Sequence, residues 1–151
     1  MNKEQFQQRV FKNGKPLDLE LFSWNEEKNV FITKESNLEI DFTYAVYNCI
    51  FITGDNCTFK TGSVHRFITG DNCTFITNHG CIFDTGSGCD FSTGDGCTFD
   101  TGSNCTFKTG VRCVIVSRSS FKVIEPKPGE IIKTGVLGTI GYETIKTNVN
   151  K

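Results

Sequence analysis

The sequence lacks the features that mark several common classes of protein. Its 151 residues carry a formal net charge of −1, so no overall electrostatic field would draw the chain to nucleic acid or to an anionic membrane. No apolar run reaches the roughly 18 residues that a membrane-spanning helix needs. The first residues also lack the apolar stretch of a secretory signal. We therefore expect a protein of a reducing cytosol, with neither a membrane nor a nucleic acid as its partner.

Methionine and proline are scarce, at one and three residues, whereas phenylalanine and glycine reach 14 and 15. This imbalance indicates a repeated sequence rather than an ordinary globular mixture. The stretch FITGDNCTF occurs at residues 51–59 and again at residues 67–75. An interval of 16 residues therefore has a structural meaning that the rest of the chain must explain.

Cysteine is the clearest marker of the repeat. The eight cysteines are spaced by eight residues, except for one double gap that His65 fills: Cys49, Cys57, Cys73, Cys81, Cys89, Cys97, Cys105 and Cys113. The repeating unit is C-x-F-x-T-G-x-x. Cys, Phe and Thr alternate with variable residues, which predicts a short strand with one constant face. The remaining positions predict a tight turn in which glycine tolerates positive φ.

Two arrangements fit such strands, an antiparallel meander in one sheet or a solenoid with two strands per coil. Similar octads recur at twice the octad length, as in CIFDTG at residues 81–86 and CTFDTG at residues 97–102. This favours the solenoid, because alternate octads then stack in two facing sheets. We predict an all-β fold, a parallel β-solenoid with two strands and 16 residues per coil over residues 37–118, with ladders of Cys, Phe and Thr inside.

The ends of the chain do not repeat. Residues 1–36 predict an N-terminal cap of short strands, with a short helix within residues 2–10 and turns at Asn13-Gly14 and at residues 25–29. Residues 119–151 predict a C-terminal capping hairpin and tail, with the hairpin turn at Pro126–Gly129. Open solenoid ends would expose unpaired strand edges, so capping is the simplest role for both segments.

The residues that could carry chemistry are few. The cysteine spacing forms a column rather than the clustered ligands of a zinc site, and neighbouring thiols in register are too far apart for a good disulfide. His65 occupies an inward cysteine position, and His79 and the aspartates Asp55, Asp71 and Asp95 lie in turns. We expect no catalytic, metal or cofactor site; an enzyme or small-ligand binder would have only these histidines and aspartates to use.

The two outer faces of the predicted solenoid differ. One face is polar, whereas the other carries the residues that we expect to bind a partner: Ile50, Ile52, Ile68, Ile82, Asp84, Asp100, Val114 and Val116. Clustered aliphatic side chains on an outer face mark a covered or partner-binding surface. Three occupants fit this face: the terminal segments of the chain, a second copy in a homodimer or homotrimer, or another protein.

The units GDNCTFKTG, GDGCTFDTG and GSNCTFKTG resemble those of octapeptide-repeat proteins encoded by tailed bacteriophages and some other large viruses. The flanks FSWNEEKNVFITKESNLEIDF and CVIVSRSSFKVIEPKPGE are also similar, so the resemblance spans roughly residues 20–132. It implies a phage protein with a solenoid fold and no known catalytic residues. From the repeat, the lack of a catalytic constellation and the unequal outer faces, we expect a non-enzymatic protein that binds a host or phage protein in the cytoplasm of an infected cell, for example to inhibit host defence. The alternative is a structural part of the virion, in a tail or fibre.

Overall fold

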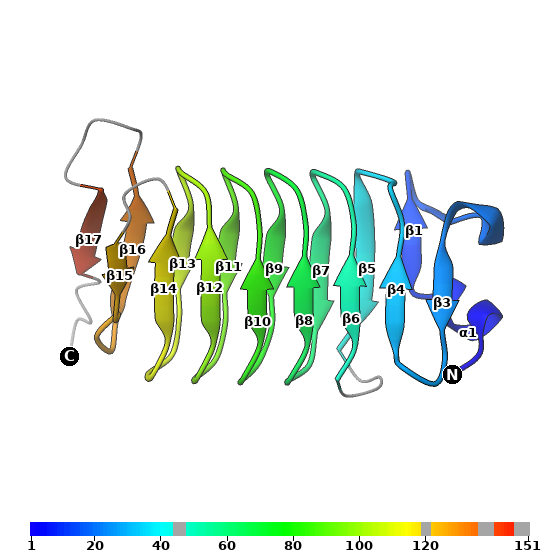
Figure 1. The fold of residues 1–151 in the computed structure, drawn as a ribbon, viewed down its shortest axis with the longest axis horizontal. Helices are drawn as coiled ribbons and strands as arrows, with labels where there is room; N and C mark the ends of the chain where they lie inside the picture. Colours follow the sequence, from blue (N-terminus) through cyan, green and yellow to red (C-terminus); the bar gives the residue numbers. More distant parts are fainter. Residues whose placement is uncertain (44–47, 119–121, 136–140, 147–151) are drawn as a thin grey trace.

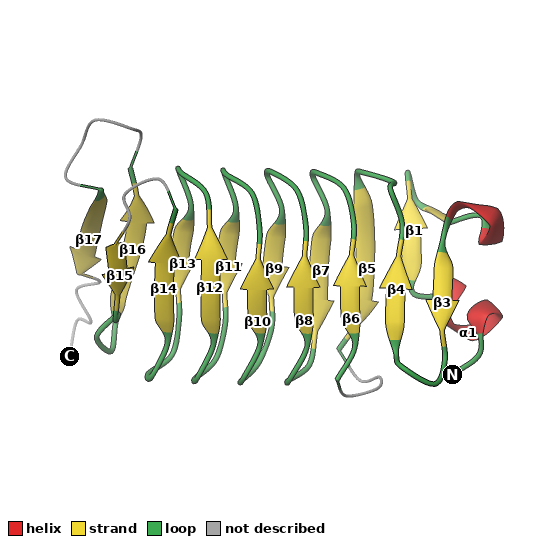
Figure 2. Cartoon of the chain, viewed as in Figure 1, coloured by secondary structure: helices red, strands yellow, loops and turns green. Residues whose placement is uncertain are grey.

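The computed structural model describes residues 1–43, 48–118, 122–135 and 141–146. Figure 1 shows two β-sheets that face each other, with the strands of each sheet stacked along a straight rod. Figure 2 shows that helix is confined to the N-terminal end. The elements are α1 (Lys3–Gln7), β1 (Val10–Lys12), β2 (Lys15–Pro16), the 3-10 helix η1 (Leu19–Leu21), β3 (Ser23–Asn25), β4 (Val30–Ile32), β5 (Leu38–Phe42), β6 (Ile50–Ile52), β7 (Thr58–Thr61), β8 (Arg66–Ile68), β9 (Thr74–Ile76), β10 (Ile82–Asp84), β11 (Asp90–Ser92), β12 (Thr98–Thr101), β13 (Thr106–Lys108), β14 (Val114–Ser117), β15 (Lys122–Ile124), β16 (Glu130–Thr134) and β17 (Tyr142–Lys146).

Successive octads alternate between the two sheets. Sheet A has the strand order β17-β16-β13-β11-β9-β7-β5-β1-β2, and sheet B has the order β15-β14-β12-β10-β8-β6-β4-β3. From β6 to β14 the neighbours within a sheet are parallel and in register, so that Phe67 pairs with Phe51 and Phe83. The predicted solenoid, with two strands and 16 residues per coil, is confirmed.

Phenylalanine fills the space between the sheets. Within sheet B, the rings of Phe83 and Phe99 are stacked, with centroids 4.8 Å apart and an interplanar angle of 4°. Across the gap, Phe83 meets Phe91 of sheet A edge-on, at 5.2 Å and 74°. Every repeat Phe from residue 51 to residue 107 is buried. Each buries ~150 Å² or more of apolar surface, so this double ladder is the main stabilising element of the rod.

The chain turns at two long edges. At the first edge (residues 53–57, 69–73, 85–89 and 101–105) it passes from sheet B to sheet A, and at the second edge (residues 61–65, 77–81, 93–97 and 109–113) it returns; these edges are the upper and lower ones in Figure 1. Cysteine lines both edges from inside, and all eight cysteines are buried. Backbone N–H groups donate to thiols of the next coil, as Cys57 N does to Cys73 Sγ at 3.4 Å.

The recurring glycine after threonine does not have the conformation that we expected. Positive φ falls instead on the residue before each cysteine, for example on Asn56 at 55° and on Gly88 at 70°. The glycine is needed for a close approach, because a Cβ on Gly86 would lie 1.9 Å from Oδ1 of Asp71 in the preceding coil. Asp71 holds that position because it accepts a hydrogen bond from the N–H of Ser87 at 2.7 Å.

The N-terminal segment closes one end of the rod. Helix α1 begins with a capping box between Asn2 and Gln5, and it places Phe6 against the first rings of the ladder, 4.9 Å from Phe31. Strands β1 and β2 form the hairpin predicted at Asn13-Gly14, and β3 and β4 form the second one. The parallel stack already begins at β4, which pairs with β6.

The C-terminal segment closes the other end differently from the prediction. The hairpin expected around Pro126–Gly129 is wrong: β15 pairs antiparallel with β14 in sheet B, whereas β16 pairs antiparallel with β13 in sheet A. The turn therefore carries the chain from one sheet to the other. This path covers the open edges of both sheets, which a hairpin in one sheet would not do. The hairpin at this end is formed by β16 and β17.

Candidate interaction face

The outward side chains of sheet B form two columns that run along the rod. Because every second residue of a strand points to the same face, the parallel register lines up corresponding positions of successive coils. Column one holds Val30, Ile50, Arg66, Ile82, Thr98 and Val114. Column two holds Ile32, Ile52, Ile68, Asp84, Asp100, Val116 and Val123. We call this surface the sheet B face.

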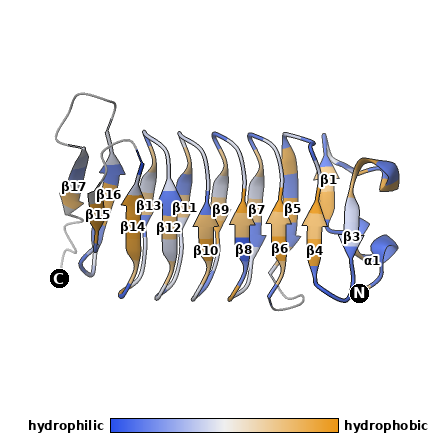
Figure 3. Cartoon of the chain, in the orientation of Figure 1, coloured by the Kyte–Doolittle hydropathy of each residue, from blue (hydrophilic) through white to orange (hydrophobic). Residues whose placement is uncertain are grey.

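Aliphatic side chains on the sheet B face reach solvent. Ile32 is 44% exposed, Ile82 46% and Val123 67%. In Figure 3 the strands β4, β6, β10 and β14 are largely orange, whereas β12 is pale. Strands β6, β10 and β12 each have one inward Phe, so the contrast among them arises from the outward residues. On the repeat strands of sheet A the outward residues are Thr, Lys, Asp and Ser, with Ile76 as the exposed exception.

All eight residues predicted to bind a partner lie on the sheet B face. Strands β6, β8 and β10 bring the four isoleucines together, and β14 carries Val114 and Val116. Strand β12, with Thr98 and Asp100, separates the two aliphatic groups. The prediction missed Val30, Ile32 and Val123, because they lie outside the octads and had no register from the repeat.

Asp84 and Asp100 are not a bare pair of like charges. They are neighbours on β10 and β12, and Arg118 bridges them, with Nη1 3.3 Å from Asp84 Oδ1 and Nε 3.3 Å from Asp100 Oδ1. The same guanidinium donates a hydrogen bond to the carbonyl of Thr85. Arg118 stands where the octad has glycine, and the sequence had no signal for its contacts with Asp100 one coil away and Asp84 two coils away. All three side chains are about half exposed, so this pairing adds little to stability.

The terminal segments do not lie over the sheet B face within the part of the chain that the structure describes. Figure 1 places α1 and β1–β3 at one end of the rod and β15–β17 at the other. They lengthen the two sheets instead of crossing them. The described terminal residues therefore do not cover this face, and a second copy or another protein is left as its occupant.

His65 belongs to the core. Its Nδ1 accepts a hydrogen bond from the backbone N–H of Cys49 at 3.2 Å, in place of a thiol of the cysteine column. Burial lowers the pKa of His65 to about 4, so the ring is neutral near neutral pH. His79 lies exposed in a turn. Among the described residues, neither ring is hydrogen-bonded to a nucleophile or to a carboxylate, as a catalytic base would be.

The turn aspartates have structural roles. Asp55 Oδ1 accepts from the N–H of Asp71 at 2.9 Å, and Asp95 Oδ1 accepts from that of Val111 at 2.9 Å. Each carboxylate therefore ties its coil to the next one, whereas ordinary turn chemistry would bond it to the backbone of its own turn. Among the described residues, no group of three or more His, Cys, Asp or Glu side chains is arranged to hold a metal ion. Burial also raises the pKa of the Cys49 thiol to about 11, which makes it a poor nucleophile.

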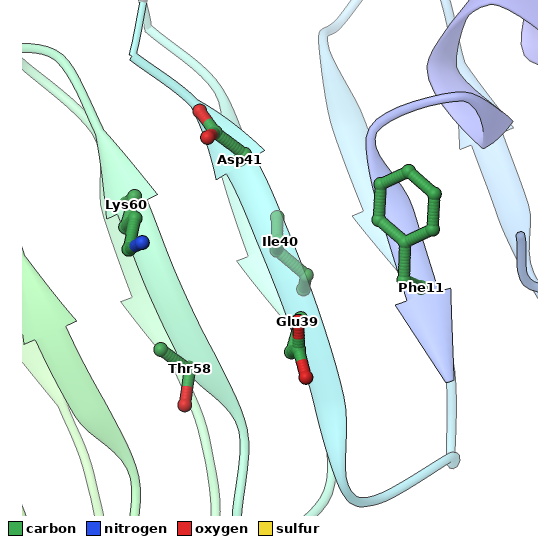
Figure 4. Close-up of a pocket in the computed structure, with 6 residues that line it drawn as sticks. All are labelled: Phe11, Glu39, Ile40, Asp41, Thr58 and Lys60. Atoms are coloured by element: carbon green, nitrogen blue, oxygen red, sulfur yellow. The ribbon is translucent and has the colours of Figure 1, made fainter. Parts of the chain in front are cut away.

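The outer face of sheet A has a hollow of 420 Å³ near the N-terminal end. Figure 4 shows Phe11, Glu39, Asp41, Thr58 and Lys60 around it, with Ile40 on the far side of its strand. Glu39, Asp41 and Lys60 are exposed, so water already solvates these charges. This arrangement is typical of a polar surface and indicates no particular ligand.

Comparisons with known proteins leave the function to be argued from the structure. No protein-family model matches the chain, and no curated protein or solved structure matches it either. Among the helices that the structure describes, none is long and apolar enough to cross a membrane.

Proposed function

We propose that the protein is a non-enzymatic interaction module that binds another protein chain through the sheet B face. The observation that carries this proposal is the set of aliphatic side chains in the two columns of the sheet B face, which the described terminal residues leave uncovered. Exposed aliphatic clusters of this kind mark protein-binding surfaces in soluble proteins. The polar outer face of sheet A, built from the same repeat, shows that the solenoid itself does not require such residues.

The architecture suits this role physically. Stacked Phe rings and continuous backbone pairing hold the sheet B face in one shape. A preorganised surface loses little conformational entropy on binding, so a modest aliphatic area can suffice for association. We place this activity in the cytoplasm of a phage-infected cell, with inhibition of host defence as the proposed outcome. The resemblance of the octads to phage octapeptide repeats supports this placement.

Site-specific photo-cross-linking tests the proposal. A benzophenone amino acid would replace Ile68 on the sheet B face or, as the matched control, Ile76 on the outer face of sheet A. In cells that produce the protein, we expect a cross-linked protein product from position 68 and none from position 76. The product at a neighbouring position, Ile52, should disappear when Ile68→Asp is added, while the melting temperature stays unchanged. Equal products from both faces, or none from either, would contradict the proposal.

A further inference from the structure

A positive charge stands within the aliphatic part of the sheet B face. Arg66 lies in column one between Ile50 and Ile82, and its side chain is exposed. None of the ion pairs among the described residues includes it. A guanidinium in apolar surroundings needs a carboxylate when water is displaced from it. Whatever covers this face must therefore bring an acidic group to Arg66.

The same face carries an acidic group one strand away from Arg66. Asp84 and Asp100 share the single guanidinium of Arg118, so one negative charge remains uncompensated at that place. Asp84 lies in column two and is the neighbour of Ile68 along that column. The face thus offers both the cation and the anion of an intermolecular pair, in different columns and on adjacent strands.

A twofold axis parallel to the rod makes these features complementary. Such an axis places each strand opposite the same strand of a second copy and reverses its direction, so that column one faces column two. Ile50 then lies opposite Ile52 of the second copy, and Val30 and Val114 lie opposite Ile32 and Val116. Arg66 lies opposite Ile68 of the second copy. Asp84 of the second copy is on the next strand of the same column, so it is offset from Arg66 by one strand spacing, about 4.8 Å along the rod. The symmetry repeats this ion pair, so two form per dimer.

The other simple twofold arrangement is less favourable. An axis along the strands would set each column against itself in reverse order. Centred between β8 and β10, it would bury Asp84 against Ile68 and Asp100 against Ile52. Burying carboxylates against aliphatic side chains carries a large desolvation cost. The arrangement with parallel rods sets Asp84 opposite Ile82 of the second copy but brings the guanidinium of Arg66 close to it, and it sets Asp100 opposite Thr98 instead of an aliphatic side chain.

We propose that the occupant of the sheet B face is a second copy of the chain, packed face to face about a twofold axis parallel to the rod. This inference rests on the proposed function, since it names the partner of the same surface. Six strands at a spacing of about 4.8 Å, each with three or four residues of about 3.3 Å, give about 300 Å² per copy. The total of about 600 Å² lies below the roughly 1,000 Å² of stable specific interfaces, in the size range of weak, transient contacts. The dimer is therefore weak and reversible, with a dissociation constant in the micromolar range.

Sedimentation velocity of the full chain over a wide range of protein concentration tests this inference. We expect a shift from monomer to dimer as the concentration rises. Ile68→Asp should abolish the shift. Arg66→Glu should weaken dimerisation by at least about tenfold and reverse its dependence on salt, because salt then screens a repulsion between the new carboxylate and Asp84. Ile76→Asp and Lys60→Glu introduce the same changes on the outer face of sheet A and should leave the dimer intact. Thermal melting of each variant confirms that it is folded.

Three outcomes would overturn the inference. They are a monomer at every concentration, a trimer, or a dimer that Ile68→Asp does not affect. A monomer that still cross-links from position 68 to a different protein would overturn the second copy as the partner and leave the proposed function standing. A monomer that cross-links to nothing would overturn both.

Discussion

The two long edges of the rod are built from the same octad, yet their polar groups are paired to different extents. At the first edge, the threonine hydroxyls donate hydrogen bonds to the carbonyl of the following glycine: Thr53, Thr69, Thr85 and Thr101. At the second edge, four buried atoms have no hydrogen-bond partner among the described residues: Thr61 Oγ1, His65 Nε2, Thr77 Oγ1 and Thr109 Oγ1. Within residues 53–113, the residues that replace the Cys and the Gly of the repeat, His65 and Asn78, also lie at the second edge.

The cysteine columns show the same contrast. At the first edge, Cys57, Cys73, Cys89 and Cys105 form an unbroken column, which ends where Cys105 N donates to Thr134 Oγ1 at 2.9 Å. At the second edge, His65 interrupts the column. One edge of a two-sheet solenoid can therefore have the more regular hydrogen bonding while the other edge tolerates substitutions. Four predictions test this difference between the edges.

The largest expected effect is a clash at the first edge. Alanine at Gly86 would place Cβ 1.9 Å from Asp71 Oδ1 and 2.9 Å from the carbonyl carbon of Gly70. We expect Gly86→Ala to lower the free energy of unfolding by about 3 kcal/mol. Gly62→Ala meets nothing closer than 3.5 Å among the described residues and should be neutral or stabilising by up to about 1 kcal/mol. The contrast depends on the neighbouring coil and not on the edge, because a Cβ on Gly110 at the second edge would lie 2.0 Å from Asp95 Oδ1. Urea unfolding would measure both variants, and equal losses would contradict the clash as the cause.

The second effect depends on pH and arises from His65. Burial lowers its pKa to about 4, whereas the unfolded chain binds the proton with the ordinary pKa of about 6.5. The unfolded state therefore takes up more protons between these values, and stability falls as the pH decreases from 6.5 to 4. Between pH 7.5 and pH 5 we expect His65 to account for a loss of about 2 kcal/mol.

His65→Cys restores the column and should remove this part of the pH dependence. Cys97→Ser, two coils further along the same column, should retain it. Urea unfolding at a series of pH values would measure the slope for all three proteins. A slope that is unchanged in His65→Cys would show that His65 does not titrate as its burial implies.

The third effect concerns the hydrogen bonds that join coils at the first edge. Asp71→Ala removes the acceptor of the Ser87 N–H, which lies 2.7 Å from Asp71 Oδ1. We expect a loss of about 1 kcal/mol, because this turn is exposed and water can replace part of the interaction. Asp71→Asn keeps an acceptor and should recover most of the loss. His79→Ala, at the corresponding position of the second edge, should change the unfolding free energy by less than about 0.5 kcal/mol.

The smallest effect is a relief of backbone strain. Val64 has φ of +63° and is 50% exposed, although β-branched residues rarely adopt this conformation. Asn72 holds the corresponding position at the first edge with φ of +56°. We expect Val64→Asn to raise the melting temperature by a few degrees, for a gain of about 0.5–1 kcal/mol. Asn72→Val should lower it by a similar amount, and the same sign for both changes would refute this explanation.

Much of the fold could be predicted because the repeat is strict. The copies at residues 51–59 and 67–75 predicted both the coil length and the inward positions of Phe51 and Phe67. The eight outward candidates followed from the same register. Val30 and Ile32 were missed because β4 pairs with β6 across an interval of 20 residues, which differs from the 16 residues of the repeat. The hairpin at Pro126–Gly129 failed because local turn residues do not specify which sheet each strand joins.

The sequence by itself determined the coil, its buried Phe core and the difference between the two outer faces. Side chains alternate between the two faces of a strand, and each octad repeats the same strand, so the octad position of a residue decides whether it points inward or outward. Tertiary structure alone decided why glycine follows threonine, since the limiting contact is with Asp71 of another coil and not with the local backbone. It also decided that Arg118 reaches Asp84 and Asp100 and that β15 and β16 close different sheets. These contacts join residues far apart in the chain, and the stacking of coils creates the distances that govern them.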